Sequence, residues 1–230
     1  MIRLRRSEKP APASSFLVVG DVHGRDDLLA RAFARADEIG VPLISVGDVA
    51  DRGPDSAAAL RRLAERQDAI CLMGNHEEMM IDFLDGAVDR GLHWLRHGGR
   101  ETLESFGVSP SFRPMDQEAA RVALVRAMGS DLVEWLRARP SYWISGNVAI
   151  THAGADPFRP LDAQDRELRW GHPDFGRRGR RDGLWIVHGH NIVPKPLMRN
   201  RIISIDTGAW ATGRLTLALF EDGGLRFEST

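Results

Sequence analysis

Cysteine is nearly absent from this chain of 230 residues, which has Cys71 alone. A single cysteine cannot form a disulfide within the chain, so the small folds held together by disulfides are excluded. The same scarcity is typical of proteins from a reducing compartment such as the cytoplasm. Cys71 lies inside an apolar run, where we expect it to be a small buried residue.

Long apolar runs are also lacking, and the net charge is small. No stretch reaches the ~18 apolar residues of a membrane span, and residues 1–15 have no apolar core of a signal peptide. We expect residues 1–15 to form a flexible leader rather than a docking arm, and residues 16–230 to form a single domain. The formal net charge of −1 gives no positive field that would attract nucleic acid or a membrane. The sequence therefore predicts a cytoplasmic protein with neither as a partner.

Apolar runs alternate with helical periodicity in the first third of the chain. The runs predict strands over 16–19, 41–46 and 69–73, with helices over 25–39, over 54–66 and from about residue 77. This alternation is typical of an α/β fold with parallel strands. Short β-branched runs predict a second sheet, mixed or antiparallel, from residues 142–145, 148–151, 184–187, 202–205 and 215–220. Helices are expected over 100–106, 116–128 and 131–137, and a surface segment over 157–183.

Polar side chains bracketed by glycine follow each of the first three predicted strands. The motifs are Gly20-Asp21-Val22-His23-Gly24, Gly47-Asp48-Val49-Ala50-Asp51-Arg52-Gly53 and Gly74-Asn75-His76-Glu77. Asp21, Asp48 and Asn75 are separated by equal steps of 27 residues. Because the carboxyl ends of parallel strands meet at one edge of a sheet, we expect these side chains to gather there. Oxygen and imidazole ligands together suit Mn, Fe or Zn, and two such ions can bind a phosphate between them.

Two later motifs place histidines after strands of the second group. They are Thr151-His152-Ala153-Gly154 and His188-Gly189-His190. The alternative interpretation of each polar residue is structural: an Asx turn at a helix start for the aspartates and Asn75, or a hydrogen-bonded loop histidine. Five strand exits of this kind in one chain favour the metal interpretation.

In their order, spacing and flanking residues, these motifs resemble the phosphoprotein phosphatase branch of the calcineurin-like metallophosphoesterases, especially its bacterial and phage-type serine/threonine phosphatases. The resemblance runs from Phe16 to Phe220. It includes the segments 79–82, 93–95 and 205–209. It implies a four-layer α/β sandwich in which helices flank two mixed β-sheets.

The resemblance also implies a ligand set for two divalent metal ions, Mn with Fe or Zn as alternatives. The first ion would be held by Asp21, His23 and Asp48. The second would be held by Asn75, His152 and His190, with Asp48 bridging the two. A metal-bridging hydroxide would then attack phosphorus in line. Of the two histidines in the last motif, His190 is the expected ligand and His188 a structural neighbour.

Three further roles follow from the same resemblance. His76 would act as general acid on the leaving oxygen, a contribution of ~10²–10⁴-fold. Asp51 would orient His76 and favour its charged form. Arg52 would bind phosphate oxygens as charge develops in the transition state. His93 and His97 are expected to be structural or to lie at the rim of the substrate site.

The chain departs from the family pattern in its phosphate-binding arginines. Many members carry an arginine directly before the Gly-Asn-His-Glu motif, where this chain has Met73. Many also have an arginine after a tryptophan in the region that follows His152. Here Trp170 is followed by glycine, with Arg169 before it and Arg177-Arg178 further on. Each donor lost would cost ~2–4 kcal/mol of transition-state stabilisation.

The sequence therefore predicts an enzyme, a metallophosphoesterase that hydrolyses phosphomonoesters, with phosphoserine or phosphothreonine in proteins as substrate. A small phosphorylated molecule is the other partner considered. An alternative is hydrolysis of dinucleoside polyphosphates of the diadenosine tetraphosphate type, which requires an aromatic group near the site for the base. A third interpretation is a weakly active metal-binding regulatory protein. The loops over 86–116 and 157–183 carry no pattern that identifies the substrate.

Overall fold

The computed structural model describes residues 9–221 and 224–230, which form two five-stranded sheets. The first sheet has the strand order β10-β9-β1-β2-β3. β1, β2 and β3 are parallel, whereas β9 pairs antiparallel with both β1 and β10. The strand bounds are β1 Phe16–Val19, β2 Leu43–Ser45, β3 Ile70–Cys71, β9 Thr216–Glu221 and β10 Gly224–Ser229.

The second sheet has the order β4-β5-β6-β8-β7. Its central strands β5, β6 and β8 are parallel, and the edge strands β4 and β7 are antiparallel to their neighbours. The bounds are β4 Tyr142–Ser145, β5 Val148–Thr151, β6 Trp185–His188, β7 Leu197–Arg199 and β8 Ile202–Ser204. Both sheets are therefore mixed, with a parallel centre in each.

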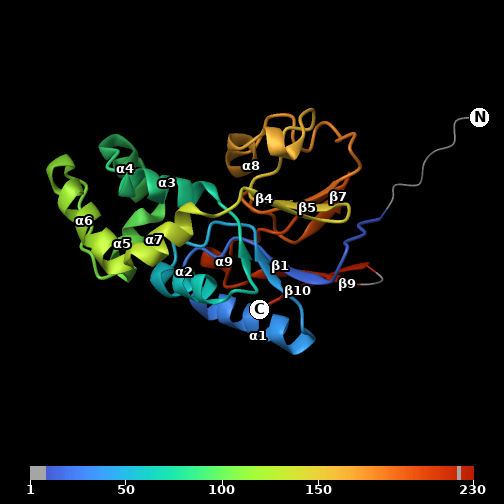
Figure 1. Cartoon of the computed structure of the whole chain (residues 1–230), viewed down its shortest axis with the longest axis horizontal. Coiled ribbons are helices and arrows are strands. Elements are labelled where there is room, and N and C mark those ends of the chain that lie inside the picture. The colour runs from blue at the N-terminus through green and yellow to red at the C-terminus, as the bar shows by residue number, and fades with distance from the viewer. Residues whose placement is uncertain (1–8, 222–223) are drawn as a thin grey trace, which may run out of the picture.

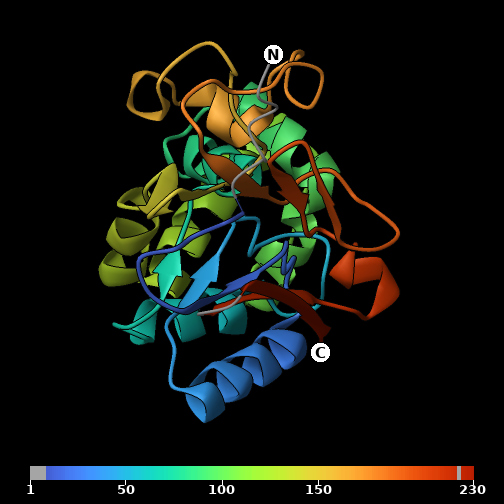
Figure 2. The ribbon, with the colours of Figure 1, turned by 90° about the vertical axis from the view of Figure 1, so that its right-hand side faces the viewer.

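Helices cover the outer faces of the two sheets and extend to one side. Figure 1 shows α1 and α2 below the first sheet, α8 above the second, and α3 to α7 as a group beside them. Figure 2 shows the same succession of layers from the side. The helix bounds are α1 Asp26–Ile39, α2 Ser56–Glu65, α3 Asn75–Leu84, α4 Val88–Trp94, α5 Arg100–Ser105, α6 Gln117–Met128, α7 Ser130–Arg137, α8 Arg166–Trp170 and α9 Ala209–Thr212. A π-helical turn, Leu95–Gly99, joins α4 to α5, and short 3₁₀ turns span Pro114–Asp116 and Leu161–Ala163.

The strands bury apolar side chains on both faces, and their sequences are therefore continuous apolar runs. In β1, Phe16 and Val18 pack between the sheets, and Leu17 and Val19 pack toward the helices. Each fully buried side chain of this size contributes roughly 1.5–3 kcal/mol. The predicted α/β class with two mixed sheets and flanking helices is confirmed.

One strand was assigned to the wrong sheet from sequence. The run over 215–220 was expected in the second sheet, but β9 belongs to the first and pairs with β1, Phe16 opposite Phe220. Its Ala218 and Phe220 face the second sheet while Leu217 and Leu219 face the helices. A strand buried on both faces has the same apolar pattern in either sheet, so the pattern alone does not identify its partner.

The expected leader over 1–15 falls partly outside the described residues, which begin at residue 9. Residues 11 and 13 make hydrogen bonds that a free leader would lack. The Ala11 N–H donates to Asn147 Oδ1 at 2.6 Å, and the Ala13 N–H donates to Ser145 Oγ at 2.9 Å. Within the part of the chain that the structure describes, no helix is both long and apolar enough to span a membrane.

Candidate active site

The carboxyl ends of the parallel strands from both sheets meet at one place. Polar residues leave β1, β2 and β3 of the first sheet and β5, β6 and β8 of the second. In chain order these residues are Asp21, Asp48, Asn75, His152, His190 and Asp206. This edge is where open α/β sheets place their ligands, since successive loops diverge there and leave room between them.

One group of donor atoms forms around His152. Its Nε2 atom lies 2.9 Å from Asn75 Oδ1 and 3.3 Å from Asp48 Oδ1. His190 Nδ1 lies 2.9 Å from the same Asn75 oxygen. The ligand atoms of Asp48, His152 and His190 are all within 4.8 Å of one another, a spacing at which one cation can contact all three.

A second group shares Asp48 with the first. His23 Nε2 lies 3.6 Å from Asp48 Oδ2, and His76 Nε2 lies 3.9 Å from it. Asp21 adjoins the first group, since its carboxylate accepts the backbone N–H of His190 at 3.0 Å. All six predicted ligand residues therefore lie in one cluster, with Asp48 at its centre.

Two histidines of the cluster are oriented by backbone carbonyls. His23 Nδ1 is 2.8 Å from the Ala50 oxygen, and His152 Nδ1 is 3.1 Å from the Val46 oxygen. A carbonyl oxygen only accepts, so both Nδ1 atoms carry protons and both Nε2 atoms face the cluster. This arrangement is typical of histidines that ligate metal ions.

The charges of the cluster also fit a cation. Burial raises the pKa of Asp21, and the nearby carboxylates of Asp206 and Asp48 raise it further. Burial lowers the pKa of His23 to about 3 and that of His190 to about 4, so both rings are neutral with a lone pair to donate. Burial opposes the charged form of His152 as well, but Asp48 outweighs it and raises the pKa to about 9. The buried acids, with the neutral rings of His23 and His190 beside them, are stabilised by bound divalent ions.

His76 is paired with Asp51. Its Nδ1–H donates to Asp51 Oδ2 at 2.6 Å. Burial disfavours the charged form of His76, but the nearby Asp48 and the hydrogen bond to Asp51 raise its pKa above the ordinary value. The fully buried Asp51 carboxylate also accepts Trp94 Nε1–H at 2.9 Å and the Thr102 hydroxyl at 2.6 Å.

Arg52 reaches the cluster from its solvent side. Its guanidinium donates to His23 Nε2 and to His76 Nε2, each at 2.9 Å. The backbone N–H of Arg52 donates to the Gly98 carbonyl at 3.2 Å. The guanidinium also lies 5.8 Å from the ring centroid of Trp210, within range of a cation–π contact.

The loops of the cluster have unusual backbone conformations. Among the residues that the structure describes, seven non-glycine residues have positive φ, and five of them belong to this region: His23, Asp48, Asp51, Arg52 and His190. Such conformations concentrate at functional sites, where neighbouring groups must hold them. The Glu77 carboxylate does so for the β2 exit, because it accepts the N–H groups of Asp48 and Val49 at 2.8 Å each.

The arginines near the site do not occupy the positions that the family pattern predicts. Met73 is buried where many members have arginine, and its N–H donates to the Pro140 carbonyl. Arg169 is engaged by Glu78 at 3.1 Å and by Asp165. Arg177 and Arg178 line a separate pocket with Trp185 and Asn200. Of the arginines weighed from sequence, Arg52 is the one in contact with the cluster.

His188 lies outside the cluster. Its Nδ1–H donates to the Gly189 carbonyl and its Nε2 bonds the Ser204 hydroxyl, both at 2.8 Å. Burial lowers its pKa to about 4, so the ring is neutral. The structure therefore places His190, and not His188, beside His152.

Four residues around the site had no role assigned from sequence. Glu77 accepts the Asp48 N–H, Trp94 and Thr102 donate to Asp51, and the charge of Asp206 acts on Asp21. Glu77, Trp94 and Asp206 lie within segments that carried the family resemblance. The sequence therefore placed them near the site but did not predict their contacts. Thr102 gave no signal, because its partner Asp51 is 51 residues away in the chain.

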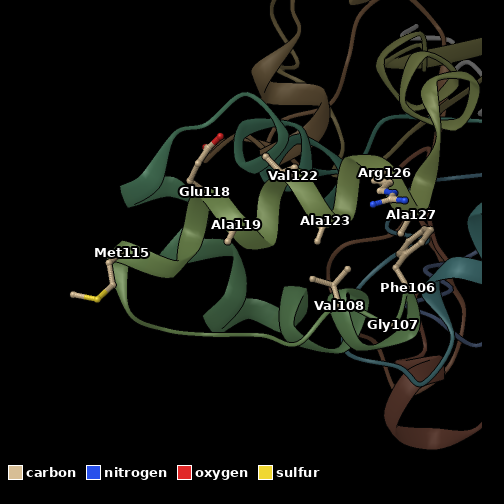
Figure 3. A pocket seen from close by; sticks show the side chains of 10 residues that line it. All are labelled: Phe106, Gly107, Val108, Met115, Glu118, Ala119, Val122, Ala123, Arg126 and Ala127. Carbon is tan, nitrogen blue, oxygen red and sulfur yellow. The ribbon is translucent and has the colours of Figure 1, made fainter.

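Another pocket lies away from this site. Its volume is about 930 Å³, and Figure 3 shows it between α6 and the loop that follows α5. Its lining is mainly apolar, with Phe106, Val108 and Val122 among the ten residues, and it contains none of the cluster residues. A smaller pocket of about 350 Å³ lies directly against Arg52.

The sequence is similar to curated proteins of two activities. It is 30% identical over 230 residues to bis(5′-nucleosyl)-tetraphosphatase PrpE (asymmetrical) of Bacillus velezensis, with 86% of each chain covered. It is 40% identical over 207 residues to serine/threonine-protein phosphatase 1 of Salmonella typhimurium, covering 87% of this chain and 89% of that one.

Solved structures share the fold. The crystal structure of a proposed diadenosine tetraphosphatase matches with a TM-score of 0.64 at 21% identity, over 96% of this chain and 95% of that one. A cold-active protein-tyrosine phosphatase of Shewanella matches with a TM-score of 0.60 at 17% identity, over 95% of this chain and 83% of that one. The family model for calcineurin-like phosphoesterases matches residues 14–199. With this match and the relatives above, the chain belongs to the calcineurin-like phosphoesterase family and is a hydrolase.

Proposed function

We propose that this protein is a dinuclear metal-dependent phosphoesterase that hydrolyses phosphomonoesters, with phosphoserine and phosphothreonine in proteins as its substrates. The observation that carries the proposal is the position of Asp48, shared between two groups of donor atoms, directly beside the His76–Asp51 pair. The similarity to a serine/threonine-protein phosphatase supports the protein substrate.

The residues present fit two divalent ions. Asp21, His23 and Asp48 would hold one ion, and Asn75, His152 and His190 would complete the second site with Asp48. Mn is the proposed metal, with Fe or Zn as alternatives, because a mixture of oxygen and imidazole ligands suits all three. When bound, the ions supply Lewis acidity at phosphorus and a nucleophilic water at neutral pH.

The side chains around the ions supply the remaining chemistry. As water oxygen bonds to phosphorus and the ester P–O bond breaks, His76 would give a proton to the leaving oxygen. Asp51 would hold the His76 ring and favour its charged form. Arg52 would exchange its hydrogen bonds to the imidazoles for phosphate oxygens, which are stronger acceptors.

A second candidate substrate is a bis(5′-nucleosyl) tetraphosphate. It is favoured by Trp210, an aromatic side chain that is 42% exposed and adjacent to Arg52. The similarity to PrpE supports it as well. A third candidate is a metal-binding regulatory protein, which would retain the metal ligands and have only weak turnover.

A substrate panel with two variants tests the proposal. Purified protein with Mn²⁺ is assayed with a phosphothreonine peptide, diadenosine tetraphosphate and p-nitrophenyl phosphate. We expect turnover by the wild type and a loss of at least ~10²-fold in Asp48→Asn and His76→Asn. Undiminished turnover in both variants would refute the hydrolytic proposal, and absence of wild-type turnover would favour the regulatory protein.

The proposed location is the cytoplasm. Cys71 is a free, buried thiol, which is compatible with a reducing compartment. Burial raises the pKa of this thiol well above its ordinary value, so it stays protonated and unreactive.

A further inference from the structure

A cationic pocket with an exposed tryptophan opens against the catalytic arginine. Its volume is about 350 Å³, and we call it the Trp210 pocket. It is lined by Arg52, Leu95, Arg96, His97, Gly98, Arg100, Glu101 and Trp210. Because Arg52 also contacts His23 and His76, the pocket continues directly from the cluster. It therefore lies where a part of the substrate beyond the reacting phosphate would extend.

The pocket carries more positive than negative charge. Three arginines line it, against the single carboxylate of Glu101, which leaves an excess of two positive charges among these four residues. The Arg96 side chain is exposed and has no hydrogen bond or ion pair to any residue that the structure describes. Arg100 pairs with Glu104 at 3.0 Å, but at 55% exposure of its side chain this pair is readily exchanged for another anion.

Trp210 supplies an aromatic surface at the same place. It lies on α9, the short helix that follows the β8 exit, and α9 is bounded by Gly208 and Gly213, both in the left-handed conformation. These two turns fix the helix at the rim of the site. A tryptophan left 42% exposed beside an arginine offers a ring face for stacking, and a purine base uses such faces.

We infer that the Trp210 pocket binds the leaving part of a nucleoside polyphosphate, with the base on Trp210 and the distal phosphates along Arg96 and Arg100. This inference rests on the proposed phosphoesterase activity and selects its second candidate substrate. A nucleoside polyphosphate carries both an aromatic base and several negative charges, so it engages both features of the pocket. A seryl or threonyl leaving group carries neither within its own side chain.

The test compares two substrates on the same enzyme. The probes are diadenosine tetraphosphate and glycerol 2-phosphate, and the readout is the ratio of their kcat/KM values in the presence of Mn²⁺. We expect Trp210→Ala to lower this ratio about tenfold, as loss of one base–aromatic stack does, and Trp210→Phe to restore most of it. We expect Arg96→Gln to lower the ratio several-fold through KM, with a weaker salt dependence of KM.

Arg177→Gln is the matched control, because Arg177 is an exposed arginine on a pocket away from the cluster. It should leave both kcat/KM values unchanged. An unchanged ratio in Trp210→Ala and Arg96→Gln would overturn the inference. A phosphothreonine peptide is assayed in parallel. A loss of kcat/KM confined to this peptide would also overturn the inference, because it would assign the pocket to protein substrates. Either result leaves the proposed hydrolysis standing, since that is judged by Asp48→Asn and His76→Asn.

A binding measurement separates recognition from turnover. We expect ATP to inhibit glycerol 2-phosphate hydrolysis at a lower concentration than inorganic triphosphate does, because only ATP carries a base. Trp210→Ala should remove this difference. Equal inhibition by the two compounds in the wild type would overturn the role of Trp210.

Discussion

Asp51 connects the helices beside the sheets with the site by hydrogen bonds. Its buried carboxylate accepts hydrogen bonds from His76, Trp94 and Thr102, and its backbone N–H bonds the Ser56 and Thr102 hydroxyls. A buried anion with three donors is well compensated, so its position is fixed. The orientation of His76 is therefore set by side chains far away in the sequence.

The first prediction concerns the charge of Asp51. Asp51 is one of the groups that raise the pKa of His76, and a general acid with a raised pKa keeps its proton to higher pH. In Asp51→Asn this contribution is lost, so the basic limb of the kcat/KM profile should move to lower pH and the maximum rate should fall about 10²-fold. A pH profile with p-nitrophenyl phosphate at saturating Mn²⁺ measures both effects.

Asp55→Asn is the control for that experiment. It removes the same charge four residues away, where the side chain caps α2 by accepting the Ala58 N–H. Asn keeps the Oδ1 acceptor and is as good an N-cap as Asp, so this variant should keep its stability and leave the basic limb in place. A basic limb that moved equally in both variants, or in neither, would contradict the role of Asp51.

Trp94→Phe tests whether the hydrogen bond from Trp94 Nε1–H positions Asp51. The substitution removes the Nε1–H donor but keeps an aromatic ring against Phe83, whose ring centroid lies 5.0 Å away. We expect a loss of about 1–3 kcal/mol in the free energy of unfolding, since a buried charged acceptor loses a donor. We also expect kcat to fall several-fold with KM little changed.

The comparison variant is Trp135→Phe, in a half-buried tryptophan that packs on the same core without contacting Asp51. Thermal unfolding and steady-state kinetics measure the two variants side by side. If Trp135→Phe lowered kcat as much as Trp94→Phe, the hydrogen bond to Asp51 would not be the cause.

At the level of the elements, the strand exits were predictable and the helical support was not. Each exit carries its own signal, a polar residue such as Asp21 or Asn75 directly after an apolar run. Parallel pairing then brings those residues to one edge without further information. The contacts of Trp94 and Thr102 depend on how α4 and α5 pack against the β2 exit, and local sequence patterns do not encode such long-range packing. The short strands β7 and β10 and the exposure of Trp210 were not predictable for the same reason.

The turn between α4 and α5 gives an element-scale prediction at Gly98. This glycine has φ of 116°, and a Cβ added there would lie 2.6 Å from the Arg52 backbone nitrogen and 2.8 Å from Arg52 Cγ. Gly98→Ala should therefore displace Arg52 and lower kcat/KM by more than tenfold. Steady-state kinetics with a phosphomonoester provide the measurement.

Gly107→Ala isolates the backbone strain from the collision. Gly107 also has positive φ, at 74°, but nothing lies within 4 Å of an added Cβ. Both variants should lose about 1–2 kcal/mol of stability from the left-handed conformation. Only Gly98→Ala should lose activity, and equal activity in the two variants would show that the turn does not position Arg52.

On the scale of the whole molecule, the fold gathers like charges at one edge of its core. Burial raises the pKa of both Asp21 and Asp206, each close to Asp48, because a charged carboxylate is disfavoured there. Divalent ions that bind this arrangement in the folded state should stabilise it, by about 2.7 kcal/mol at 100 times the dissociation constant. For a domain of this length, that predicts a rise in Tm of roughly 5–10 °C on adding Mn²⁺ to metal-stripped protein.

Two variants calibrate the thermal shift. Asp48→Asn should remove most of the rise, since Asp48 is shared by both donor groups. Asp37→Asn removes an exposed carboxylate on α1 that pairs with Arg66, and it should keep the full rise. The account would be wrong about Asp48 if Asp48→Asn responded to Mn²⁺ as the wild type does.

The central claim is that hydrolysis depends on two metal ions held at this edge of the sheets. The most direct measurement is the turnover of a phosphomonoester by metal-stripped protein, at micromolar concentration, as Mn²⁺ is added in known amounts. The account predicts no turnover before addition and a plateau near two ions per chain. Full turnover of the stripped protein in the presence of EDTA would contradict it.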